Sequence, residues 1–175
     1  MQVKRILEIL RKKRWFLLAC AFAATMIVIW FTTRMKMIEP PETIWKLHRM
    51  ELFSGDTAQA VISELHGFDR APKDNFVANY VSPDGCGQLY VSFYENNVTA
   101  SQEMERMSRK IQSGDFPDFS HLRRIEMERI PMVLSQGMRK VHYFFTYRNG
   151  LYWFDIDAPV AQFTVREFVR YLRKQ

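Results

Sequence analysis

The sequence is poor in cysteine, glycine and proline. Its 175 residues include two cysteines, seven glycines and seven prolines. Two cysteines are too few for a disulfide framework or a cysteine-based zinc site. The scarcity of glycine and proline excludes a collagen-like or low-complexity chain, and a hydrophobic content of 47% excludes a disordered one. These absences leave a folded chain with the length of about one domain.

Recognisable metal and cofactor motifs are also missing. The four histidines stand far apart, and no pair has His-x-x-x-His or Cys-x-x-Cys spacing. Gly85-Cys86-Gly87 lies between two strand-like runs, whereas a phosphate-binding loop needs a helix directly after it. The sequence therefore predicts no metal and no cofactor.

The positive charge is confined to the N-terminus. The chain has a formal net charge of +6, but residues 1–36 contain eight Lys and Arg against one acidic residue, which amounts to +7. The remainder is thus close to neutral, at −1. A near-neutral domain argues against nucleic acid as a partner, because nucleic-acid binding depends on a basic surface.

Residues 15–33 are the strongest candidate for a membrane anchor. They contain no charge and no proline, and as a helix they would extend roughly 28 Å, close to the thickness of a bilayer core. Aromatic and basic side chains typical of a membrane interface flank the segment: Trp15, Trp30, Arg11, Lys12, Lys13 and Arg14. The N-terminal end of the segment, which carries the basic residues, is expected to remain in the cytoplasm.

Other interpretations of this segment fit less well. A buried globular helix would show a polar face, and a cleaved signal peptide would need small residues after the apolar run. Lipidation at Cys20 is an alternative, although the apolar stretch before it is short. We expect a basic cytoplasmic N-terminus (1–14), a transmembrane helix (15–33), a linker (34–42) and an extracytoplasmic domain (43–175). The expected location is the inner membrane of a bacterial envelope, with the C-terminal domain in the periplasm or outside the cell.

The residue patterns of the domain predict an α+β fold. Apolar spacing and capping residues indicate helices over residues 43–52, 56–66, 99–113 and 159–174. Alternation of polar and apolar residues indicates strands over residues 75–82, 88–95, 122–129 and 132–136 and a hairpin over residues 139–157. Pro131 is expected to end or bulge its strand. We expect an antiparallel sheet with helices on one face, ferredoxin-like in its general plan.

The hairpin over residues 139–157 gives the most detailed prediction. Asn149-Gly150 is a preferred two-residue turn, which places Tyr147 opposite Tyr152 and His142 opposite Asp157. One face of this hairpin is then almost wholly apolar and should form the core. The other face carries mixed residues: His142, Phe144, Thr146, Arg148, Leu151, Trp153, Asp155 and Asp157.

Two groups could carry chemistry. A carboxylate beside His142 would raise its pKa and suit proton transfer, but an ordinary cross-strand polar pair is the simpler interpretation and the one we favour. Cys86 lies in a turn, where it could be a free thiol, an intermolecular cross-link or, with a base beside it, a nucleophile. Neither group forms a recognisable catalytic set.

The mixed face of the hairpin suggests protein binding. Phe144, Leu151 and Trp153 should either be covered by a second layer or form a partner-binding patch with Arg148, His142 and Asp157 at its border. We therefore expect a non-enzymatic accessory or scaffolding subunit with the lipid bilayer, a membrane-protein complex or a second copy as partners. A small-ligand or sensory domain is the alternative, and an enzyme using His142 with Asp157 or Cys86 is the third.

Overall fold

The computed structural model describes residues 37–66, 72 and 74–175. The expected membrane anchor, residues 15–33, lies outside this range. Among the residues described, no helix has the length and apolar character needed to cross a bilayer. The compact unit that contains the described residues begins at Met37. Residues of the expected linker pack onto it: Ile38 and Pro40 are buried, and the Tyr80 hydroxyl donates to the carbonyl of Pro41 at 2.7 Å.

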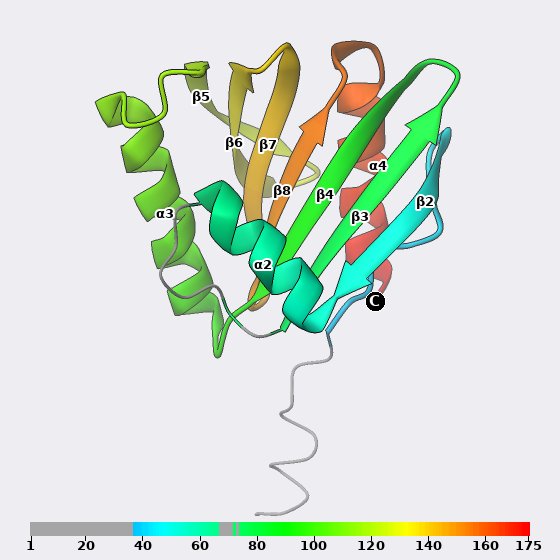
Figure 1. The fold of residues 1–175 in the computed structure, drawn as a ribbon, viewed down its shortest axis with the longest axis horizontal. Coiled ribbons are helices and arrows are strands. Elements are labelled where there is room, and N and C mark those ends of the chain that lie inside the picture. Colours follow the sequence, from blue (N-terminus) through cyan, green and yellow to red (C-terminus); the bar gives the residue numbers. More distant parts are fainter. Residues whose placement is uncertain (1–36, 67–71, 73) are drawn as a thin grey trace, which may run out of the picture. The chain divides into compact units, whose positions relative to one another are not determined.

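Eight strands form one antiparallel sheet in the described part of the chain (Figure 1). Two meanders, β1 to β4 and β5 to β8, meet where β4 pairs with β8, so the order is β1-β2-β3-β4-β8-β7-β6-β5. The strands are β1 Thr43–Ile44, β2 Leu47–Ser54, β3 Asp74–Ser82, β4 Gly85–Phe93, β5 Phe119–Met127, β6 Ile130–Gly137, β7 Lys140–Tyr147 and β8 Gly150–Ile156. The α+β class is confirmed, but this order of elements is not ferredoxin-like.

Helices cover both faces of the sheet, so the prediction of helices on one face was wrong. The described helices are α2 Gly55–His66, α3 Asn97–Ser113 and α4 Ala158–Lys174. Helices α2 and α3 lie in front of the sheet in Figure 1, and α4 lies behind it. Each face has its own apolar core, because the central strands carry large apolar side chains in both directions.

The predicted helix over residues 43–52 is instead the hairpin of β1 and β2. Ile44 and Leu47 have the i, i+3 spacing of a helix face, but here a two-residue turn places them opposite each other as a cross-strand pair. Both side chains are buried, with about 1% of their surface exposed. A tight turn thus satisfies the same apolar spacing as one helical turn.

The helices at residues 56–66, 99–113 and 159–174 are confirmed with small shifts of their ends. Helix α3 begins earlier than expected, because Asn96 caps it by accepting a hydrogen bond from the Thr99 amide at 2.9 Å. Gly114 ends it with φ 85°, a conformation that glycine adopts without strain. Pro131 lies inside β6, and the described ladder between β6 and β7 begins only at Met132.

The turn of the hairpin formed by β7 and β8 lies one residue earlier than predicted. Tyr147 pairs with Gly150, so the two loop residues are Arg148 and Asn149. The Asn149 side chain donates to the Tyr94 carbonyl at 2.8 Å, and a side chain at Gly150 would meet the Tyr152 ring at 2.7 Å. The hydrogen bond therefore fixes Asn149 in the loop, and the lack of space for a side chain at position 150 favours glycine at the start of β8. The predicted faces are preserved, whereas every predicted pair is replaced.

We expect Asn149→Ala to lower the free energy of unfolding by about 1 kcal/mol or more, because the Tyr94 carbonyl would lose its side-chain donor. Chemical denaturation of the full chain in lipid nanodiscs measures the change. Gln162→Ala, at an exposed position of α4, is the control and should have little effect. Equal stability of the two variants would contradict the anchoring role of Asn149.

Candidate functional site

The apolar candidates from the sequence are buried. Phe144, Leu151 and Trp153 expose 2%, 5% and 6% of their surfaces and pack with residues of α2 and α3. Of the two alternatives that the sequence left open, cover by a second layer is the one found. Arg148 is exposed in the turn, with its guanidinium 5.4 Å from the Tyr147 ring centre. These residues do not form one surface patch.

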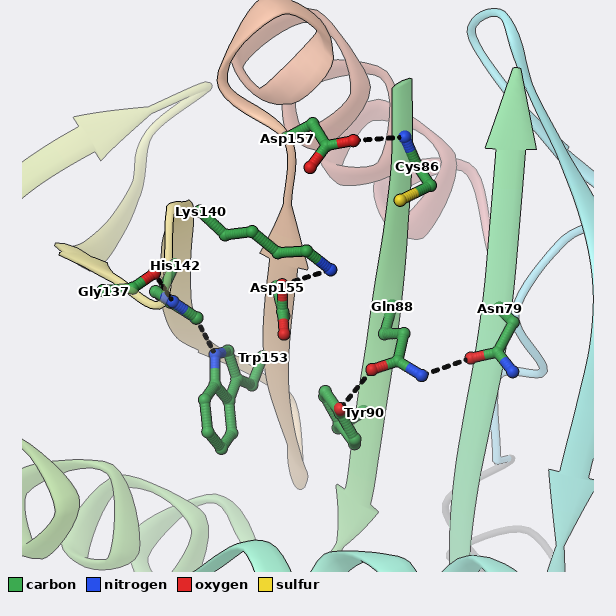
Figure 2. Close-up of polar contacts among 10 residues, drawn as sticks. All are labelled: Asn79, Cys86, Gln88, Tyr90, Gly137, Lys140, His142, Trp153, Asp155 and Asp157. Carbon is green, nitrogen blue, oxygen red and sulfur yellow. Dashed lines mark hydrogen bonds and ion pairs between the residues drawn. The ribbon is translucent and has the colours of Figure 1, made fainter. Parts of the chain in front are cut away.

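His142 and Asp157 are not opposite each other, because the turn is shifted. His142 pairs with Asp155 instead. Asp157 precedes α4, where its carboxylate accepts a hydrogen bond from the Cys86 amide at 2.7 Å (Figure 2). The predicted cross-strand pair of His142 with Asp157 is therefore wrong, and Asp157 joins β4 to the start of α4.

Both ring nitrogens of His142 are in hydrogen bonds. The Trp153 indole donates to Nδ1 at 3.2 Å, and Nε2 lies 3.0 Å from the Gly137 carbonyl, which can only accept. This arrangement fits a neutral imidazole protonated on Nε2. Burial lowers the pKa of His142, against opposing contributions from the Gly137 carbonyl and the Asp155 charge. The neutral ring thus links β7, on which it stands, to Trp153 of β8 and to Gly137 of β6.

A largely covered ion pair lies next to this histidine. The Lys140 ammonium is 3.0 Å from the Asp155 carboxylate, and the two side chains expose 24% and 17% of their surfaces. Burial by itself lowers the pKa of Lys140, but the hydrogen bond and charge of Asp155 outweigh it and raise that pKa. The Lys140 ammonium therefore stays charged at neutral pH.

Asp155 of this ion pair belongs to a row of polar side chains that crosses six strands on the α2/α3 face. Successive members are direct cross-strand neighbours: Glu51, Asn79, Gln88, Asp155, His142 and Ser135. Figure 2 shows the central part of this polar row. Because the members occupy one register position on neighbouring strands, they form a continuous band across the sheet.

A directional chain of hydrogen bonds runs through one half of the polar row. The Tyr90 hydroxyl donates to Gln88 at 2.6 Å, Gln88 donates to Asn79 at 2.8 Å, and Asn79 donates to Glu51 at 2.8 Å. Burial raises the pKa of Tyr90 to about 12, with a further contribution from Asp155. The tyrosine therefore stays protonated and acts as a donor. The chain fixes the orientation of both amides.

A small pocket opens beside His142, where α3 meets β7 and β8. Its volume is about 70 Å³, well below the roughly 150 Å³ of a cavity that holds benzene. The walls are mainly apolar and aromatic, with Lys110, His142 and Asp155 as polar members: Met107, Lys110, Ile111, Phe116, Phe119, Met138, His142, Phe144, Trp153 and Asp155. The pocket can take a group of a few carbon atoms.

Cys86 has no features of an activated nucleophile. Burial raises its pKa, and Asp157 adds to this effect through a hydrogen bond and its charge. The thiol therefore remains protonated at neutral pH. Within the described ranges, no three potential metal ligands from histidine, cysteine and acidic residues converge.

Sequence reasoning missed both the polar row and the pocket. Asn79 and Gln88 stand in the two strands that were predicted as a hairpin, so the correct turn would have placed them opposite each other. The pocket depends on how α3 crosses β7 and β8, which connects distant parts of the chain. Local patterns carry no signal for that crossing.

We predict that His142 makes stability dependent on pH below neutrality. The lowered pKa means that the unfolded chain, with an ordinary histidine pKa of 6.5, takes up a proton before the folded chain does. The free energy of unfolding should therefore fall as the pH drops below about 6.5. Denaturation between pH 7.5 and 5 tests this, and His142→Phe should show a shallower decline than the wild type. His121→Phe, at an exposed position, is the control; equal slopes in all three proteins would contradict the prediction.

Comparisons of the chain with protein-family models, with curated proteins and with solved structures found no match.

Proposed function

We propose that this protein is a membrane-anchored accessory or scaffolding subunit whose extracytoplasmic domain binds a partner protein. The proposed anchor is the apolar segment 15–33, with the basic N-terminus in the cytoplasm of a bacterial cell. The proposed contact is the open sheet surface, which we define as Asn79, Val81, Cys86, Gln88, Lys140 and Asp155. This surface replaces the aromatic patch expected from the sequence, whose members are buried.

The observation that carries the proposal is a change in exposure along the strands of one sheet face. On β3, Val77 is 1% exposed, whereas Val81, four residues further on the same face, is 41% exposed. Figure 1 shows α2 crossing only one half of β3 and β4, with no described helix over the other half. The half that lacks a helix carries the open sheet surface.

The chemistry of this surface suits a protein partner. The amides of Asn79 and Gln88 are held in fixed orientations, and the ion pair of Lys140 and Asp155 has already lost most of its contact with water. Preorganised polar groups beside an exposed apolar side chain are typical of a protein interface. Such groups can bind backbone or side-chain amides with little further loss of entropy.

We expect a photoreactive amino acid at Val81 to cross-link a partner protein in native membranes. The same amino acid at Gln162, exposed on α4 behind the sheet, is the matched control. Lys140→Ala should reduce the Val81 adduct several-fold, because it leaves the Asp155 carboxylate without its cation. Recovery of the Val81 variant without an adduct, or with the same adducts as the Gln162 variant, would contradict the proposal.

The pocket beside His142 favours a second candidate function, the binding of a small ligand. Its apolar walls suit a short alkyl group, and Lys110 at its border suits a carboxylate. This candidate corresponds to a sensory or ligand-binding domain.

Butyrate is a suitable probe for the pocket because it combines a short alkyl chain with a carboxylate. We expect millimolar butyrate to raise the melting temperature of the full chain in nanodiscs. Ile111→Phe should abolish the increase by filling the pocket, whereas Val98→Phe, at an exposed position of α3, should retain it. The same increase in both variants would show that butyrate acts elsewhere and would exclude this candidate.

A further inference from the structure

Strand β5 forms one edge of the sheet. It pairs with β6 on one side, and no other described strand pairs with its outer side. A bulge between Ser120 and Arg123 interrupts the first part of the strand, so residues 123–127 form its regular part. An exposed regular edge has unpaired backbone groups that can extend the sheet with another strand.

The adjacent turn shows which backbone groups of β5 point outward. Met127 pairs with Ile130, and the two loop residues Glu128 and Arg129 have φ values of 51° and 62°. In such a two-residue hairpin the flanking residues exchange both hydrogen bonds. Because this direction alternates along a strand, the backbone amides and carbonyls of Ile125 and Arg123 also point toward β6. The backbone amides and carbonyls of Arg124 and Glu126 therefore face outward.

The side chains of these two outward-bonding residues have opposite charges and are exposed. Arg124 is 64% exposed even though it makes a bidentate contact with Glu105 of α3, with distances of 2.9 and 2.8 Å. Both side chains stand on the α2/α3 face, since residues two apart on a strand share a face.

We propose that β5 pairs with β5 of a second copy of this chain, around a two-fold axis at Ile125. This register places Arg124 opposite Glu126 of the second copy, and Glu126 opposite its Arg124. Both residues then occupy hydrogen-bonded positions, as their outward backbone groups require. The pairing joins two eight-stranded sheets into one sheet.

Neighbouring registers are electrostatically unfavourable. An axis at Arg124 or Arg123 would place like arginines opposite each other, and an axis at Glu126 would do the same with two glutamates. Like charges in direct cross-strand positions are destabilising. Among axes at residues 123–126, only Ile125 places β5 residues of opposite charge opposite each other and avoids a like-charged pair, so the charge pattern selects a second copy in one register.

Charge reversal tests the proposed register. Two differently tagged full-length copies are co-expressed, and co-purification from membranes is measured. When both copies carry Glu126→Arg, co-purification of one with the other should fall about tenfold or more, because two arginine pairs would replace the two favourable pairs. Arg124→Glu should do the same. Co-expression of the Glu126→Arg chain with the Arg124→Glu chain should restore recovery, because each arginine again faces a glutamate.

Glu95→Arg, an equal change of charge at an exposed position outside the strands, is the matched control and should leave recovery unchanged. Thermal unfolding of each variant checks that it folds. Loss of recovery with Glu95→Arg, or lack of restoration between two folded partners, would overturn the proposal.

A cysteine cross-link gives a second measurement that does not depend on reversing charges. With Cys20 and Cys86 replaced by serine, Ile125→Cys should form a disulfide-linked dimer on mild oxidation. Facing residues at a non-hydrogen-bonded antiparallel pair have Cα atoms about 4.5 Å apart, within the range for a disulfide. Arg123→Cys is the control, because in this register it faces Met127 rather than itself. Equal cross-linking of both variants, or none with Ile125→Cys, would overturn the proposal even if Arg124→Glu fails to fold.

Discussion

The burial of β8 on both faces is the constraint on which the rest of the domain depends. This strand pairs with β4 and β7, so it joins the two meanders into one sheet. Tyr152 and Phe154 point into the core under α4, whereas Leu151 and Trp153 point into the core under α2 and α3. A strand with large apolar side chains on both faces needs a layer on each side. The three-layer arrangement follows from this requirement.

Asp155 breaks the apolar pattern of β8, and its position marks where the core ends. It follows the buried Trp153 on the same face and lies in the polar row, beside Lys140 and Gln88. A charged side chain at this depth requires a partner, which Lys140 supplies, and the neighbouring strands continue the row with amides. The polar row therefore marks the edge of the core, and the open sheet surface begins with its members Asn79, Gln88 and Asp155. The proposed binding site lies where the sheet changes from packed to exposed.

Local patterns predicted the faces of the strands better than their partners. Alternation of residues assigned the side chains of β7 and β8 to the correct faces, because moving the turn by one residue shifts each partner by two and preserves the face. The partners depend on Asn149 and Gly150, whose contacts with Tyr94 and Tyr152 are tertiary. Ile44 and Leu47 show the same limit, since their spacing fits both a helix and a hairpin. The pocket was unpredictable because it requires the position of α3.

The two proposed interactions use different parts of one sheet. The open sheet surface lies mainly over β3, β4 and β8, whereas self-pairing uses the outer edge of β5, which two strands separate from β8. Edge pairing uses backbone amides and carbonyls that lie in the plane of the sheet. The open sheet surface instead presents side chains perpendicular to that plane. One interaction therefore need not displace the other. A second copy bound through β5 would double the number of open sheet surfaces and strengthen binding to a partner with repeated sites through multivalency.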